Sequence, residues 1–73
     1  MITNYALIKE ARDRLARMPG GDFTAVEKVG TLRAEFPDLL TWIEGQAVKR
    51  SSDYTYEDAI MRAFKRLCAA YRL

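Results

Sequence analysis

The stretch TYEDAIMRAFKRLCAAYRL, from Thr55 to Leu73, is the clearest helix in the chain. It opens on Thr55 followed by Asp58, a Thr-x-x-Asp pattern in which the threonine hydroxyl accepts a backbone N–H of the first turn. Apolar residues then recur in steps of three and four, which predicts one continuous buried stripe. Its members are Tyr56, Ala59, Ile60, Ala63, Phe64, Leu67, Cys68 and Tyr71. We expect the rest of the chain to cover this stripe.

A first helix is predicted from a cap at Thr3 or Asn4 to about Met18, where Pro19, Gly20 and Gly21 end it. Its inner positions are Tyr5, Ile8, Ala11, Leu15 and Met18, with Leu7 on the flank. Its outer side carries charges at i,i+4 spacing, which predicts two ion pairs. These pairs are Glu10 with Arg14 and Asp13 with Arg17.

Two further helices meet at Pro37. The first of them is predicted from Thr24, which fits a capping box with Glu27, to Glu35 or Phe36. A proline pushes the residue before it out of the helical region, so Pro37 ends this helix and opens the next. The inner face of the earlier helix is Val26, Val29, Leu32 and Phe36, and the later helix carries Leu39, Leu40, Trp42, Ile43, Ala47 and Val48. Because glycine costs roughly 1 kcal/mol in a helix, we expect Gly30 to mark a close helix crossing.

These elements predict an all-α fold, a compact bundle of four short helices, in which residues 1–73 form a single domain. No segment shows the alternation of a strand. Short connections favour antiparallel neighbours, whereas the break at Pro37 would also allow a steep angle between the second and third helices.

The residue inventory argues against catalysis. The chain has no histidine and one cysteine, so it lacks an imidazole base, a disulfide and the usual zinc ligands. We therefore expect no enzyme, no catalytic residue, no metal site, no cofactor and no small-molecule substrate. Cys68 falls on the apolar stripe and is predicted to be a buried, inert thiol. With no long apolar run and no signal-peptide pattern at the start, a cytoplasmic protein is expected.

Basic clustering indicates one possible function, binding to nucleic acid. The candidate contacts are Lys49, Arg50, Arg62, Lys65 and Arg66. These charges have a second interpretation, because basic residues stabilise a helix C-terminus and keep a small domain in solution. The net charge of +2 is also small for a dedicated nucleic-acid binder.

Residues 24–50 loosely resemble the helix-turn-helix of excisionase-like regulators. The likeness is carried by the order of Thr24, Ala25, Val26, Val29 and Leu32, then Leu40, Trp42, Ile43, Glu44 and Gly45. It implies a DNA-binding transcriptional regulator as the alternative function. The sequence departs from that pattern where Phe36-Pro37-Asp38 replaces a small polar turn. It departs again where Asp38, Thr41 and Glu44 stand at positions expected to contact DNA. We claim no family on this likeness.

Protein binding is the function predicted first. Four tyrosines, three phenylalanines and one tryptophan exceed what one thin four-helix core can easily enclose. The candidate contacts are Trp42, Tyr54, Arg62, Lys65 and Arg66, since tyrosine, tryptophan and arginine are enriched in interface hot spots. The other interpretation makes Trp42 a core residue and Tyr54 a hydrophobic staple. The expected partner is another protein, or a second copy in a homodimer. The protein would act as an accessory, regulator or inhibitor of the kind found in phages and mobile elements.

Overall fold

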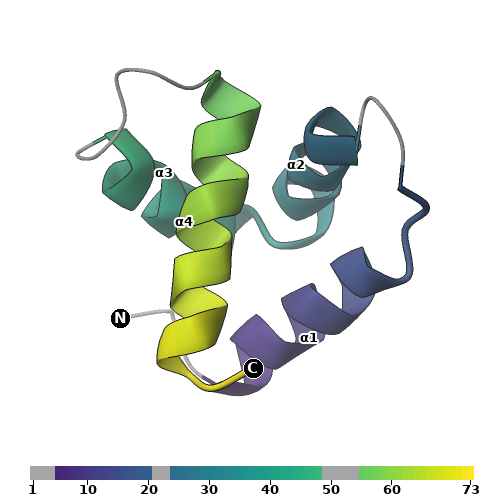
Figure 1. The fold of residues 1–73 in the computed structure, drawn as a ribbon, viewed down its shortest axis with the longest axis vertical. Coiled ribbons are helices and arrows are strands. Elements are labelled where there is room, and N and C mark those ends of the chain that lie inside the picture. The colour runs from purple at the N-terminus through teal and green to yellow at the C-terminus, as the bar shows by residue number, and fades with distance from the viewer. Residues whose placement is uncertain (1–4, 21–23, 49–54) are drawn as a thin grey trace.

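Figure 1 shows the computed structural model, which describes residues 5–20, 24–48 and 55–73. The described residues form four helices, α1 (Tyr5–Ala16), α2 (Thr24–Glu35), α3 (Pro37–Val48) and α4 (Tyr56–Ala70). The predicted all-α bundle of four short helices is therefore confirmed. The helix bounds agree with the sequence prediction to within two residues at the ends that can be compared, except that α4 ends at Ala70, three residues before the predicted Leu73.

Helix α4 is the element on which the others pack. It contacts α1, α2 and α3, and in Figure 1 it runs past α3 with α1 and α2 along its other flank. Its buried residues are Ile60, Ala63, Phe64, Leu67 and Cys68. They meet a core contributed by the other three helices, namely Ile8, Ala11 and Leu15 of α1, Val29 and Leu32 of α2, Leu39, Leu40, Ile43 and Ala47 of α3, and Phe36 between α2 and α3. Burial of these side chains provides the main driving force for folding.

The start of α4 is the predicted cap. Thr55 has an extended backbone, and its side-chain oxygen accepts the backbone N–H of Asp58 at 3.3 Å. The Thr55 carbonyl accepts the first helical bond from the N–H of Ala59 at 2.9 Å. The Thr55 side chain thus satisfies one first-turn N–H group that has no partner within the helix, that of Asp58.

The end of α4 is a Schellman motif that the sequence analysis did not predict. The N–H of Leu73 donates to the Cys68 carbonyl at 2.9 Å, and the N–H of Arg72 donates to the Ala69 carbonyl at 3.0 Å. Arg72 takes the left-handed conformation, with φ of 60°. Glycine is the usual residue at this position because it avoids the steric cost of a Cβ atom there, so the ordinary sequence signal of the motif is missing.

A single residue, Phe36, joins α2 to α3. Its N–H donates to the Leu32 carbonyl at 2.8 Å and completes α2, while its own carbonyl accepts the N–H of Leu40 at 2.9 Å and begins α3. The aromatic side chain is buried in the core. This connection is shorter than the three to four residues of a helix-turn-helix turn, so the local geometry departs from that motif as the sequence did.

Three residues expected on the inner faces are exposed instead, and one of them, Tyr56 of α4, retains 41% of its accessible surface. Of the other two, Tyr5 retains 50% of its accessible surface and Val26 retains 54%. At 100° per residue, Tyr5 lies about 90° from the centre of the face formed by Ile8, Ala11 and Leu15. Val26 is displaced by about the same angle from the Val29, Leu32 and Phe36 face. Both also belong to the first turn of their helix.

The expectation of a close crossing at Gly30 is wrong. A Cβ atom added at Gly30 would meet nothing within 4 Å, and the same holds at Gly45 in α3. Both glycines are exposed on the outer sides of their helices. They therefore weaken α2 and α3 without allowing any close approach of backbones.

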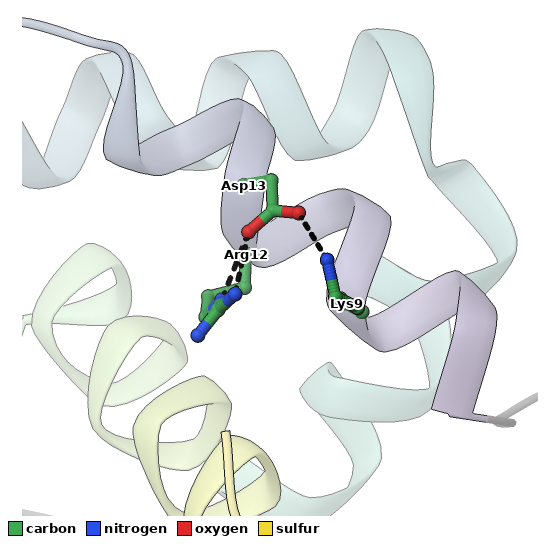
Figure 2. Close-up of polar contacts among 3 residues, drawn as sticks. All are labelled: Lys9, Arg12 and Asp13. Carbon is green, nitrogen blue, oxygen red and sulfur yellow. Dashed lines mark hydrogen bonds and ion pairs between the residues drawn. The ribbon is translucent and has the colours of Figure 1, made fainter.

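Helix α1 forms different ion pairs from those predicted (Figure 2). Asp13 pairs with Lys9, Nζ to Oδ2 at 2.9 Å, and with Arg12, Nη2 to Oδ1 at 2.6 Å. Arg14 pairs with Glu35 of α2 at 3.0 Å. Spacing alone could not show this, because Asp13 is also four residues after Lys9 and because the packing of α1 on α2 brings Glu35 to Arg14.

Candidate functional site

The solvent-facing side of α4 carries three of the predicted contact residues. Arg62, Lys65 and Arg66 are all exposed, and their spacing places them within an arc of about 100° around the helix axis. Trp42 projects from α3 beside this helix. Tyr54, Lys49 and Arg50 lie outside the described residues, so the structure tests no role for them.

A hollow of about 200 Å³ lies between α3 and α4 and contains Trp42 and Arg66. The remaining residues that line it are Gln46, Ala63, Leu67 and Ala70. Trp42 is half-buried and packs against the core. Trp42 therefore belongs partly to the core and partly to the surface, where it lines the hollow together with Arg66.

The opposite flank of α4 forms a larger depression with α2 and α1. One hollow of about 430 Å³ is lined by Thr24, Ala25, Lys28, Asp58, Met61, Arg62 and Lys65. A second, of about 290 Å³, is lined by Arg12, Leu15, Ala16, Lys28, Met61, Phe64, Lys65, Cys68 and Leu73. Lys28, Met61 and Lys65 line both hollows, so the two adjoin. We call them together the basic groove.

The predicted contact residues are therefore divided by α4. Arg62 and Lys65 line the basic groove, whereas Arg66 lines the hollow beside Trp42. Sequence reasoning did not find Lys28 and Arg12, which complete the groove from α2 and α1. Lys28 stands alone in its segment and Arg12 lies among the mixed charges of α1, and only the packing of α1 and α2 on α4 brings both to Lys65.

Arg12 is held in place by Asp13. Figure 2 shows the Arg12 side chain extending from α1 toward α4 while the Asp13 carboxylate bonds to both Arg12 and Lys9. Hydrogen bonds from Lys9 and then Arg12 hold the pKa of Asp13 below its ordinary value. The carboxylate is thus ionised at neutral pH, and it offsets part of the Arg12 charge at the edge of the groove.

A separate polar cluster joins three helices at the surface. The Tyr56 hydroxyl donates to Glu44 Oε2 at 2.8 Å and accepts from Arg33 Nη2 at 3.0 Å. The Arg33 guanidinium also lies 5.8 Å from the centre of the Tyr56 ring. Partial burial, followed by the hydrogen bond to Glu44, raises the pKa of Tyr56. Glu44 and Tyr56 therefore act together as a link between α3 and α4, a role that the sequence analysis assigned to neither.

Cys68 is buried, as predicted from its place on the stripe. Burial raises the pKa of its thiol, so the unreactive protonated form dominates at neutral pH. Among the residues that the structure describes, no three potential ligands gather where a metal ion would bind. None of the helices in this part of the chain combines the length and apolar character needed to cross a lipid bilayer.

Comparisons with protein families, with curated proteins and with solved structures gave no match to the chain.

Proposed function

We propose that the protein is a small non-enzymatic interaction module that binds a partner protein through the outer side of α4 and the depressions beside it. The observation that carries this proposal is the mixture of side chains in those depressions. Half-buried Trp42 and Met61 lie beside Arg66 and Lys65, respectively. Aromatic residues, methionine and arginine are enriched in protein interfaces, where an apolar centre is surrounded by a polar rim.

Such a module acts by occupying a surface of its partner, as an accessory, regulator or inhibitor. Its single, buried cysteine is compatible with a reducing cytoplasm, where we propose that it works. The partner is a different protein in the first instance. A homodimer through the same face is the other form that we propose, and measurement of molar mass by light scattering distinguishes the two.

Site-directed photo-crosslinking in native cell extract tests the proposal. A photoreactive side chain replaces Arg62 on α4 in one protein and Glu10 in another, because Glu10 is exposed on the side of α1 that faces away from the core. We expect a discrete adduct from position 62 that excess unlabelled protein suppresses, and no such adduct from position 10. Equal labelling from both positions, or none from either, would contradict a binding surface on α4.

A DNA-binding regulator is the second candidate, supported by the exposed cations Arg62, Lys65 and Arg66 on one side of α4. Each phosphate contact would add about 0.9 to the slope of log affinity against log salt concentration. We expect mixed-sequence duplex to be retained at low salt if this function holds. Absence of any retention there removes the candidate.

A further inference from the structure

We propose that the basic groove binds an acidic amphipathic helix of the partner protein. This inference rests on the proposed protein-binding function and specifies the chemistry of what docks. Its starting point is that the two hollows along α4 adjoin at Lys28, Met61 and Lys65. A docked element therefore meets one elongated depression between α4 and the two helices α1 and α2.

The length of the groove suits a short helix. Its α4 side runs from Asp58 to Cys68, which is about 15 Å at the helical rise. A partner helix lying along it would be covered over about ten residues, or roughly three turns. That length presents apolar residues at spacings of three, four and seven, the pattern of a helix docked in a groove.

The floor of the groove is apolar. Met61 and Leu73 are half-buried, and Phe64, Leu15 and Cys68 lie beneath them. Methionine is unbranched and flexible, so Met61 can move to admit an apolar side chain from the partner. The floor therefore favours a ligand that inserts one or two apolar residues along the groove.

The rim of the groove is cationic. Its four basic residues are Arg12, Lys28, Arg62 and Lys65. Asp58, at one end, is the single acidic residue among the described residues that line it. Asp13 offsets part of the Arg12 charge, whereas Lys28 and Lys65 lie together where the hollows adjoin. Aspartate and glutamate on both sides of the partner's apolar stripe complement this rim.

Other occupants fit less well. A nucleic acid would satisfy the cations but would place sugar and phosphate groups against the apolar floor. A second copy of the chain would need a free apolar stripe on an acidic helix. All four helices that the structure describes already bury their apolar sides in their own core.

A displayed library of helical 14-residue peptides, randomised along one side, is the probe for this proposal. Binders are selected on the whole protein and their affinities are measured by fluorescence anisotropy. The test variants are Lys28→Glu and Lys65→Glu, and the matched control is Arg66→Glu. Arg66 follows Lys65 in the same helix and changes the net charge equally, but it lines the hollow on the opposite flank. Circular dichroism establishes that each variant is folded.

We expect the selected peptides to carry glutamate or aspartate beside an apolar stripe. Lys28→Glu or Lys65→Glu should weaken their binding by about ten-fold, and Arg66→Glu by less than about two-fold. The proposal is overturned if the selection enriches basic peptides, peptides without an apolar stripe, or no peptides at all. It is also overturned if Arg66→Glu weakens peptide binding as much as Lys28→Glu or Lys65→Glu does. Full competition by duplex DNA, or by unlabelled protein that dimerises through the groove, overturns it in favour of those occupants. The proposed function would remain supported if crosslinking from position 62 still yields a specific protein adduct.

Discussion

Replacing Gly30 with alanine should stabilise the protein, and this change tests the arrangement of the helices. Gly30 lies in the interior of α2, on its exposed side, and an added Cβ atom would meet nothing within 4 Å. The methyl group therefore brings no steric cost. What remains is the difference in helix propensity between glycine and alanine, about 0.8–1.0 kcal/mol in favour of alanine.

The effect is large relative to the stability of so small a domain. A gain of 1 kcal/mol in the free energy of unfolding raises the melting temperature of a 60–100-residue domain by about 4–8 °C. Gly45 in α3 occupies an equivalent open position. We expect Gly45→Ala to give a similar gain, and the double variant to approach the sum because the two sites lie on different helices.

Urea and thermal unfolding, followed by circular dichroism and by the fluorescence of Trp42, measure these gains. Gly20→Ala is a comparison outside a helix, because Gly20 lies in the segment after α1, where an added methyl group also has open space. At position 20 the substitution should raise the free energy of unfolding only by restricting the unfolded chain, by about 0.4–1 kcal/mol at most. Loss of stability in Gly30→Ala would mean that another backbone does approach α2 at this point, and the packing described above would be wrong.

Four further changes follow from individual contacts, each measured by urea unfolding. Thr55→Ala removes the cap of α4 and should lower the free energy of unfolding by about 1 kcal/mol; no change would mean that the cap contributes nothing. Tyr56→Phe removes the bond to Glu44 and should cost about 0.5–1 kcal/mol, and a neutral result would show that the cluster is only a surface contact. Arg72→Gly removes the steric cost of a Cβ atom in the left-handed conformation and should raise the free energy of unfolding by up to about 1 kcal/mol. A lower free energy of unfolding would mean that contacts of the Arg72 side chain outweigh this cost. Asp13→Asn should destabilise the protein at pH values above the ordinary pKa of an aspartate, and this loss should shrink as the pH falls through the lowered pKa of Asp13 in the folded protein. A loss of stability that persists in acid would exclude the ion pairs as its cause.

The sequence prediction is most accurate for α4. There the cap, the stripe and the absence of glycine and proline all favour the same structure, and the cap and the five central stripe residues are as predicted. The stripe fails at Tyr56, which is 41% exposed, because its hydroxyl reaches Glu44 and Arg33 across the surface. Pairings of this kind depend on how three helices come together, which local periodicity does not encode.

The candidate site was only partly predictable for the same reason. Arg62, Lys65 and Arg66 could be placed on one side of a helix from their spacing. That Lys65 and Arg66 would face different depressions depends on which helix packs on each flank of α4. The contribution of Lys28 depends on the same packing, since it stands alone in its own segment of sequence.

Mapping of backbone amide shifts by NMR, with a selected acidic peptide titrated into the isotope-labelled protein, tests binding through the basic groove most directly. We expect the largest shifts at Lys28, Met61 and Lys65, and little change at Gln46 in the hollow on the other flank of α4. Shifts concentrated around Gln46, or spread over α1 away from the groove, would contradict the account.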